Sequence, residues 1–217
     1  MSETSPRAQL VVIGGGPGGY PAAFLAADQG LDVTLIDTEP NPGGVCLYRG
    51  CIPSKALLHV ARIINEAKEA QHWGLTFGEP KLDLNQLRSW KDQVVKKLTG
   101  GLGILTKQRK ITYLKCHARF TGSHALEIDQ ADGTKRPLAF DHAILSTGSR
   151  PVIPGNLKVD SPRVMDSTGA LALADVPKSL LVIGGGYIGC ELGSVYAALG
   201  SQVTVVEMAP HLVPGAD

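Results

Sequence analysis

Two cysteines stand five positions apart in the segment GGVCLYRGCIPSK, residues 43–55. Their spacing allows a small disulfide loop, and Gly50 relieves backbone strain within it. Pro53 suits the first turn of a helix, which predicts Cys51 at or just before a helix N-terminus. The helix dipole at that position stabilises a thiolate, and Lys55 adds a positive charge one turn further on. These features favour a redox-active pair over a structural disulfide or packed thiols.

A metal site is the other use of paired cysteines. A zinc site needs four ligands, and no second cysteine or histidine pair with zinc spacing occurs in the sequence. We therefore predict no metal. The chain has 217 residues and four cysteines, too few for a disulfide scaffold at this length.

Charge and hydropathy narrow the class of protein. The net charge of +1 gives no electrostatic reason to expect nucleic acid or an anionic membrane as a partner. The first residues, MSETSPRAQL, form no apolar signal segment, and no stretch is long enough to cross a bilayer. We expect a soluble, cytoplasmic protein that binds neither nucleic acid nor membrane.

The chain contains an internal repeat. Residues 10–37 and 180–207 align without a gap, each with an apolar strand, G-x-G-x-x-G, a helix and a second apolar strand. From Gly14 to Asp37, and from Gly184 to Glu207, is 23 positions. One such motif is weak evidence, but two copies with matched spacing indicate two dinucleotide-binding units.

Each glycine of these motifs has a separate task. The first permits the strand-to-helix turn, the second lets the backbone approach a pyrophosphate, and the third lets the helix pack on the sheet. In order, they are Gly14, Gly16 and Gly19 in the first copy and Gly184, Gly186 and Gly189 in the second. Asp37 and Glu207 can accept hydrogen bonds from a ribose, and Glu207 favours NAD over NADP because a carboxylate repels a 2′-phosphate. The alternative is a pair of tight turns without ligand.

The segment between the repeats is mixed. Helices are predicted over residues 51–72 and from about 83 to 108, the second loosened by glycines. Short alternating strands follow, with ADGT, residues 131–134, as a hairpin turn. We predict an α/β fold with two Rossmann-like dinucleotide-binding domains. They are a first domain over 1–150 and the first half of a second, truncated domain over 151–217.

At this point a resemblance becomes specific. The segments VVIGGGPGGYPAA, GGVCLYRGCIPSKALLHVA, AILSTGSRP and LLVIGGGYIGCELGSVYAALGSQVTVVE resemble the pyridine nucleotide–disulfide oxidoreductases in content and order. The isoleucine after the second cysteine and the helix ALLH are most similar to the dihydrolipoamide dehydrogenases within that family. Glutathione and mercuric reductases usually carry valine there.

The resemblance implies FAD on the first domain and NAD on the second. Electrons would pass from a dihydrolipoyl dithiol to the Cys46–Cys51 disulfide, then through FAD to NAD+. Cys46 would meet the substrate, Cys51 would face the flavin as a charge-transfer thiolate, and Lys55 would lie near the flavin, paired with Glu191. Further candidates for lining the FAD site are Gly44, Cys46, Ala118, Ser146, Thr147 and Gly148. Tyr187 would shield the flavin until nicotinamide enters.

The resemblance also implies partners and missing parts. The partners are the lipoyl domain of a 2-oxoacid dehydrogenase complex and, in a complete protein, a second copy in a homodimer. The C-terminal dimerisation domain, with its acid–base pair, is absent from the sequence, so we expect the chain alone to be inactive. Alternatives are a glutathione- or mercuric-reductase-like enzyme, or a non-catalytic dinucleotide-binding fragment.

Several residues depart from the family pattern or are open to a structural interpretation. Tyr48 and Arg49 stand where the family commonly has asparagine and a small apolar residue, and Asp37 replaces the usual glutamate. His59 is interpreted as a packed or partly exposed helix histidine rather than a base. Cys190 is expected beneath the second glycine turn and Cys116 on a short strand, both as packing thiols.

Overall fold

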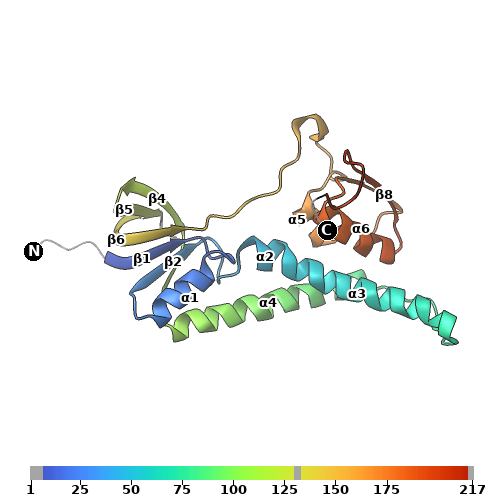
Figure 1. Cartoon of the computed structure of the whole chain (residues 1–217), viewed down its shortest axis with the longest axis horizontal. Coiled ribbons are helices and arrows are strands. Elements are labelled where there is room, and N and C mark those ends of the chain that lie inside the picture. Colours follow the sequence, from blue (N-terminus) through green and yellow to red (C-terminus); the bar gives the residue numbers. More distant parts are fainter. Residues whose placement is uncertain (1–6, 130–132, 215–217) are drawn as a thin grey trace, which may run out of the picture. The chain divides into compact units, whose positions relative to one another are not determined.

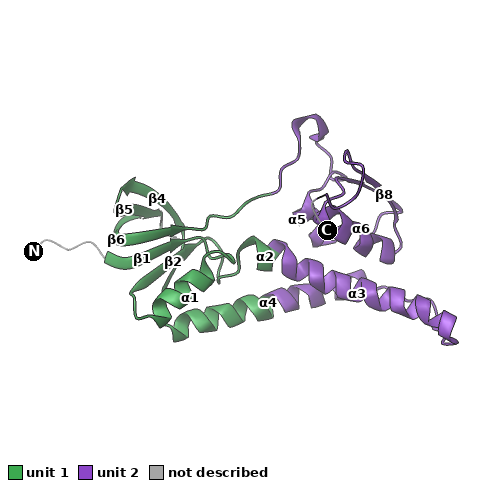
Figure 2. Cartoon of the chain, viewed as in Figure 1, with its two compact units in different colours: residues 1–48, 96–150 green, residues 49–95, 151–217 purple. Residues whose placement is uncertain are grey.

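The computed structural model describes residues 7–129 and 133–214. Contacts divide the chain into two compact units, coloured separately in Figure 2. Unit 1 comprises residues 1–48 and 96–150, and unit 2 comprises residues 49–95 and 151–217. Each unit is described by itself.

Unit 1 is built on a six-stranded sheet. Its elements are β1 (Arg7–Ile13), α1 (Tyr20–Asp28), β2 (Val33–Asp37), α2 (Gly44–Arg49, of which residues 44–48 lie in unit 1), the C-terminal part of α4 (Leu84–Gln108), β3 (Thr112–Lys115), β4 (His117–Gly122), β5 (Ala125–Asp129) and β6 (Lys135–Leu145). The strand order is β3-β2-β1-β6-β5-β4. The first four of these strands are parallel, while β4 and β5 form an antiparallel meander with β6.

Alternation along β1 explains how both faces of this sheet are buried. Leu10 and Val12 point to the face that Ala23 of α1 covers, in one apolar cluster. Val11 points to the opposite face, where it joins Leu126 and Phe140 of the meander in a second cluster. Strands buried on both faces read as continuous apolar runs, as LVVI does here.

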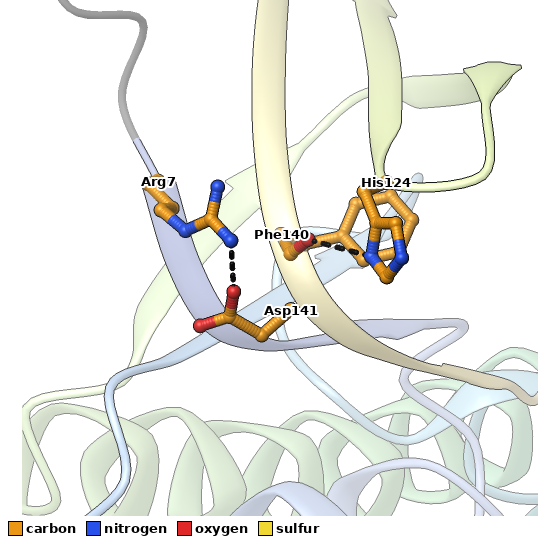
Figure 3. A network of polar contacts seen from close by, with 4 residues as sticks. All are labelled: Arg7, His124, Phe140 and Asp141. Atoms are coloured by element: carbon orange, nitrogen blue, oxygen red, sulfur yellow. Dashed lines mark hydrogen bonds and ion pairs between the residues drawn. The ribbon is translucent and has the colours of Figure 1, made fainter.

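Polar contacts fix strand pairing at the start of this sheet (Figure 3). Arg7 of β1 pairs with Asp141 of β6. The ring of His124, in the turn between β4 and β5, donates from Nδ1 to the Phe140 carbonyl oxygen over 3.2 Å, because that oxygen can only accept. The predicted ADGT turn between β5 and β6 lies partly outside the described residues, but the antiparallel pairing of its two strands is confirmed.

Unit 2 contains one βαβ unit and a group of helices. Its elements are α3 (Cys51–Glu69), η1 (Ala70–Trp73), the N-terminal part of α4, η2 (Gly155–Leu157), α5 (Ser167–Ala172), β7 (Ser179–Ile183), α6 (Tyr187–Ala198) and β8 (Gln202–Val206). Strands β7 and β8 are parallel, with Ser179 beside Gln202 and Ile183 beside Val206. Both predicted helices between the repeats are present, and α4 runs unbroken through its glycines (Figure 1).

The core of unit 2 lies between α3, α5 and α6. Leu57 and Ala61 of α3 belong to one buried cluster with Leu192 and Val195 of α6. The buried Tyr196 hydroxyl donates to the Ala170 carbonyl oxygen over 2.9 Å, which ties α6 to α5. This packing explains why residues 49–95 group with 151–217 in one compact unit. The predicted domains, residues 1–150 and 151–217, stay a prediction.

Among the described residues, no helix combines the length and apolar character needed to cross a membrane.

Candidate active site

The first glycine loop, residues 14–19, is shaped by close backbone contacts in unit 1. Gly14 has φ +102°, and a Cβ built on it would lie 2.0 Å from the Ser146 carbonyl oxygen. A Cβ on Gly19 would lie 1.8 Å from the Gly14 carbonyl oxygen. No other residue fits either position, so the turn from β1 into α1 requires these glycines.

Asp37 stands at the end of β2 and closes this loop. Its carboxylate accepts a hydrogen bond from the backbone N–H of the buried Gly15 and another, of 2.9 Å, from the N–H of Glu39. Asp37 therefore belongs to the loop itself, and its orientation is fixed before any ligand binds. The sequence predicted that Asp37 binds a ribose, but it did not predict the bond from Gly15 to Asp37. Glycine at the variable second position of both motifs, Gly15 and Gly185, could have indicated this bond.

The second glycine loop, residues 184–189 of unit 2, repeats this arrangement. Gly184 has φ +105°, and a Cβ on Gly189 would lie 2.2 Å from the Gly184 carbonyl oxygen. Glu207 accepts hydrogen bonds from the N–H of Gly185 over 2.7 Å and of Ala209 over 2.9 Å. The hydrogen bond from Ala209, and after it the one from Gly185, contributes most to holding the pKa of the Glu207 carboxyl below its usual value. The two copies of the repeat therefore share a hydrogen bond, from Gly15 to Asp37 in the first and from Gly185 to Glu207 in the second.

The start of the cysteine-bearing helix α2 lies in contact with the first glycine loop. Gly44, the first residue of α2, has φ +57°, and a Cβ on it would lie 2.5 Å from the Gly16 Cα. On the other side of the contact, a Cβ on Gly16 would lie 3.7 Å from the Gly44 Cα. Glycine is therefore needed at position 44 but not at position 16, and the contact places the start of the helix that carries Cys46 against the first glycine loop.

The segment after β6 lies against the same loop. The Ser146 N–H donates to the Ile13 carbonyl oxygen over 2.8 Å, extending the β1–β6 pairing by one step. Thr147 and Gly148 follow, exposed, with Gly148 at φ +74°. Ala118, by contrast, lies on β4 and packs against the apolar cluster of the meander. Its predicted place in a cofactor site stays a prediction.

The two cysteines occupy consecutive helical segments, one in each unit. Cys46 is half-buried in α2 and Cys51 is the exposed first residue of α3; all four cysteines are thiols. The Ser54 hydroxyl donates to the Cys51 carbonyl oxygen over 3.1 Å and the Ser54 N–H to the Gly50 carbonyl oxygen over 3.0 Å. The predicted position of Cys51 at a helix N-terminus is therefore confirmed, and Pro53 lies in the first turn.

Lys55 and Glu191 meet in unit 2. The Lys55 ammonium donates to Glu191 Oε1 over 2.7 Å, joining α3 to α6. The Lys55 side chain is 61% exposed and that of Glu191 is 30% exposed. Tyr187, the first residue of α6, is exposed after the second glycine loop. The pairing that the resemblance implied is thus present as a contact, while the catalytic roles of its members stay a prediction.

The remaining candidates lie in packing positions. The Cys190 thiol donates to the Gly185 carbonyl oxygen over 3.3 Å, beneath the second glycine loop as expected. Cys116 lies between β3 and β4 rather than on a strand, because its N–H donates to the Asp37 carbonyl oxygen and ends the β2–β3 pairing. Burial raises the pKa of its thiol. His59 is exposed on α3, with its ring centroid 6.4 Å from that of Trp90.

Fold and site together define a protein with two dinucleotide-binding βαβ units and a cysteine pair following the first. The chain matches the model of the pyridine nucleotide-disulphide oxidoreductase family over residues 8–217, and it belongs to that family. The α/β class with Rossmann-type dinucleotide-binding folds is confirmed, and so is the cofactor pair of this family, FAD and NAD.

Within this family, the chain is similar to dihydrolipoyl dehydrogenases. The chain is 49% identical over 211 residues to the dihydrolipoyl dehydrogenase of Vibrio cholerae and 51% identical over 211 residues to that of Haemophilus influenzae. Each alignment covers 97% of this chain and 44% of the relative, so the chain spans less than half of their length. A solved structure, the Cu(II) complex of the HOCl-induced flavoprotein disulfide reductase RclA from Escherichia coli, is similar with a TM-score of 0.80 and 30% identity, over 97% of this chain and 44% of that one.

Proposed function

We propose that the chain is the nucleotide- and dithiol-bearing part of a flavin-dependent disulfide oxidoreductase of the dihydrolipoyl dehydrogenase type. The contact between Gly44 and Gly16 carries this proposal, because it places the start of the Cys46-bearing helix against the first dinucleotide loop. The identity of about 50% to dihydrolipoyl dehydrogenases supports a dihydrolipoyl group as the substrate.

The residues present fit both cofactors. In the first unit, the glycine loop before the N-terminus of α1 suits a pyrophosphate, with Asp37 at the end of β2 for a ribose. In the second, Gly184, Gly186 and Glu207 offer the same groups to NAD. Bound FAD would supply a two-electron acceptor that passes the pair on to NAD+. Ser146, Thr147, Gly148, Lys55 and Tyr187 would line these sites.

The chemistry of the cysteine pair follows from thiol–disulfide exchange. A thiolate of a dihydrolipoyl group attacks the Cys46 sulfur of the Cys46–Cys51 disulfide, and the S–S bond breaks to release Cys51 as a thiolate. The second substrate thiolate attacks the first substrate sulfur and releases Cys46. The substrate leaves as a disulfide, the pair holds two electrons, and the two thiol protons go to Cys46 and solvent.

Local structure favours the role of Cys51. It is the first residue of a 19-residue helix, so it lies at the positive end of the helix dipole. Lys55 lies one turn further on, and its ion pair with Glu191 holds the cation in place. A cation at this position would offset negative charge gained by a cofactor beside Cys51.

The partners and location belong to the same proposal. A lipoyl domain of a 2-oxoacid dehydrogenase complex would present the dithiol, and a homodimer would complete the site. The cytoplasm is the proposed location. A comparison of NADH-dependent reduction of lipoamide and glutathione disulfide by the complete protein, of which this chain is a part, tests the substrate class. Faster reduction of lipoamide supports the proposal, and equal or faster reduction of glutathione disulfide contradicts it.

A further inference from the structure

Helix α2, which carries Cys46, is too short to be stable alone. It has six residues, and Leu47 is its buried side chain. Isolated helices of this length do not persist in water, so contacts with the surrounding chain must hold it. The bond from the Leu47 N–H to the Gly43 carbonyl oxygen, 3.3 Å, belongs to the helix itself, so the first external contact is the buried Leu47 side chain.

A second contact comes from a residue between the two cysteines. The half-buried Tyr48 hydroxyl donates to the Asn41 carbonyl oxygen over 3.1 Å. Asn41 belongs to the loop of residues 38–43, which begins directly after Asp37 and ends at Gly43. Tyr48 therefore ties the thiol-bearing helix to the loop that follows the ribose acid.

The loop that receives this bond is itself fixed. The Tyr113 hydroxyl of β3 donates to the Glu39 carbonyl oxygen over 2.9 Å, and burial raises the pKa of this phenol. The Gly43 N–H donates to the Gly15 carbonyl oxygen over 2.7 Å. A Cβ on Gly103 of α4 would lie 2.2 Å from Asn41 Oδ1, so the Asn41 side chain packs directly on that helix. A bond to a fixed acceptor restricts its donor.

We propose that Tyr48 is a positioning residue that holds Cys46 in place and thereby favours the Cys46–Cys51 disulfide. The inference rests on the proposed function for the existence of that disulfide, and so for a Cys46 position from which the Cys51 thiol is reached. A thiol restricted to few positions loses less conformational freedom when the S–S bond closes, which raises the equilibrium constant for closure. The hydroxyl of Tyr48 supplies this restriction, whereas its ring supplies only packing.

The first test measures the anchor without flavin reduction or turnover. Tyr48→Phe removes only the hydroxyl, and the alkylation rate of Cys46 by iodoacetamide is followed by peptide mass spectrometry in the reduced chain. We expect a rise of about fivefold, the equivalent of one hydrogen bond of about 1 kcal/mol. Tyr113→Phe is the matched control, since the bond from Gly43 to Gly15 and the packing of Asn41 on Gly103 still hold the loop; we expect less than about a twofold change there.

The second test reads the disulfide itself. In a glutathione buffer, Cys46 and Cys51 give up two electrons and two protons to glutathione disulfide, which becomes two glutathione molecules. We expect Tyr48→Phe to lower the equilibrium constant for this oxidation about fivefold, a rise in reduction potential of about 20 mV. Tyr113→Phe should match the unaltered chain.

The outcomes separate the inference from the proposed function. An unchanged Cys46 rate in Tyr48→Phe overturns the anchor, and a faster rate with an unchanged equilibrium constant reduces Tyr48 to a structural residue and also overturns the proposal. If the unaltered chain forms no Cys46–Cys51 disulfide, the proposed function fails instead, and the alkylation rate still decides whether Tyr48 holds α2.

Discussion

The Lys55 ammonium lies 2.7 Å from Glu191 Oε1, although 136 positions separate the two residues in the chain. One belongs to the helix that begins at Cys51 and the other to the helix that follows the second glycine loop. The pair therefore connects the segment of the dithiol chemistry to the segment of the second dinucleotide motif.

Replacing Lys55 with methionine tests whether this pair serves chemistry or stability. The pair is largely exposed, so its loss should lower the free energy of unfolding by less than about 1 kcal/mol. The reduction of bound FAD by dihydrolipoamide should slow by about tenfold or more, because a cation would no longer offset developing negative charge. Stopped-flow absorbance and thermal unfolding measure the two effects.

Arg62→Met provides the control, because Arg62 pairs with Glu66 over 2.6 Å on the same helix. This variant should keep the FAD reduction rate of the unaltered chain. Equal slowing in both variants would show that Lys55 acts through the helix rather than through its charge.

The contact between Gly44 and Gly16 predicts a strong effect of one methyl group. Gly44→Ala places a Cβ 2.5 Å from the Gly16 Cα at a φ of +57°, so the cysteine segment must move away from the first glycine loop. We expect loss of FAD from the purified chain and a lower melting temperature. FAD content is measured by absorbance after release of the cofactor.

Gly100→Ala is the matched change in open space. A Cβ on Gly100, within α4, meets no atom within 4 Å, so alanine should stabilise the helix by up to about 1 kcal/mol and leave FAD content unchanged. FAD retention in Gly44→Ala equal to that in Gly100→Ala would refute the predicted role of the close approach.

Glu207 makes stability depend on pH in a defined direction. Backbone N–H groups lower the pKa of this carboxyl in the folded chain, so its stabilising contribution is present above its unfolded pKa. The contribution is lost as the pH falls through the lowered folded pKa. Glu207→Gln should therefore be less stable than the unaltered chain at pH 7, and the difference should vanish in acid.

Urea unfolding across the acid range measures this difference, with Glu79→Gln in an exposed loop as the control. A Glu207→Gln deficit that persists unchanged below the folded pKa would mean that shape rather than charge is responsible.

The cysteine roles predict unequal effects of two serine substitutions. Cys51→Ser should abolish lipoamide reduction while flavin binding stays nearly intact, because the disulfide cannot form. In the complete protein, in which both substitutions are made, Cys190→Ser should retain activity, since the Cys190 thiol contacts the Gly185 carbonyl oxygen beneath the second glycine loop. Retained turnover in Cys51→Ser would contradict the assignment of Cys51.

The glycine loops could be predicted from the sequence because their constraints are local. The G-x-G-x-x-G spacing and the acid 23 positions later each reflect one βαβ unit, and both copies fold as predicted. The hydrogen bonds from Gly15 to Asp37 and from Gly185 to Glu207 were not predicted. The motif indicates where glycine is needed for backbone conformation, but it does not indicate which backbone N–H groups donate to the acid.

Other features depend on long-range packing that a single sequence does not display. Residues 49–95 group with the C-terminal segment because Leu57 and Ala61 find their apolar partners on α6. The bond from Tyr48 to Asn41 was likewise invisible, since nothing local pairs a tyrosine with a carbonyl seven positions earlier. Lys55 and Glu191 were paired by family resemblance alone.

The most direct test of the account is the visible spectrum of the purified 217-residue chain, recorded anaerobically before and after one equivalent of dihydrolipoamide. The account predicts one FAD per chain and a new long-wavelength absorption band after reduction, from a thiolate beside the flavin. Bound FAD with no spectral change would contradict the dithiol role of Cys46 and Cys51. A chain that binds no FAD would contradict the assignment of the first glycine loop.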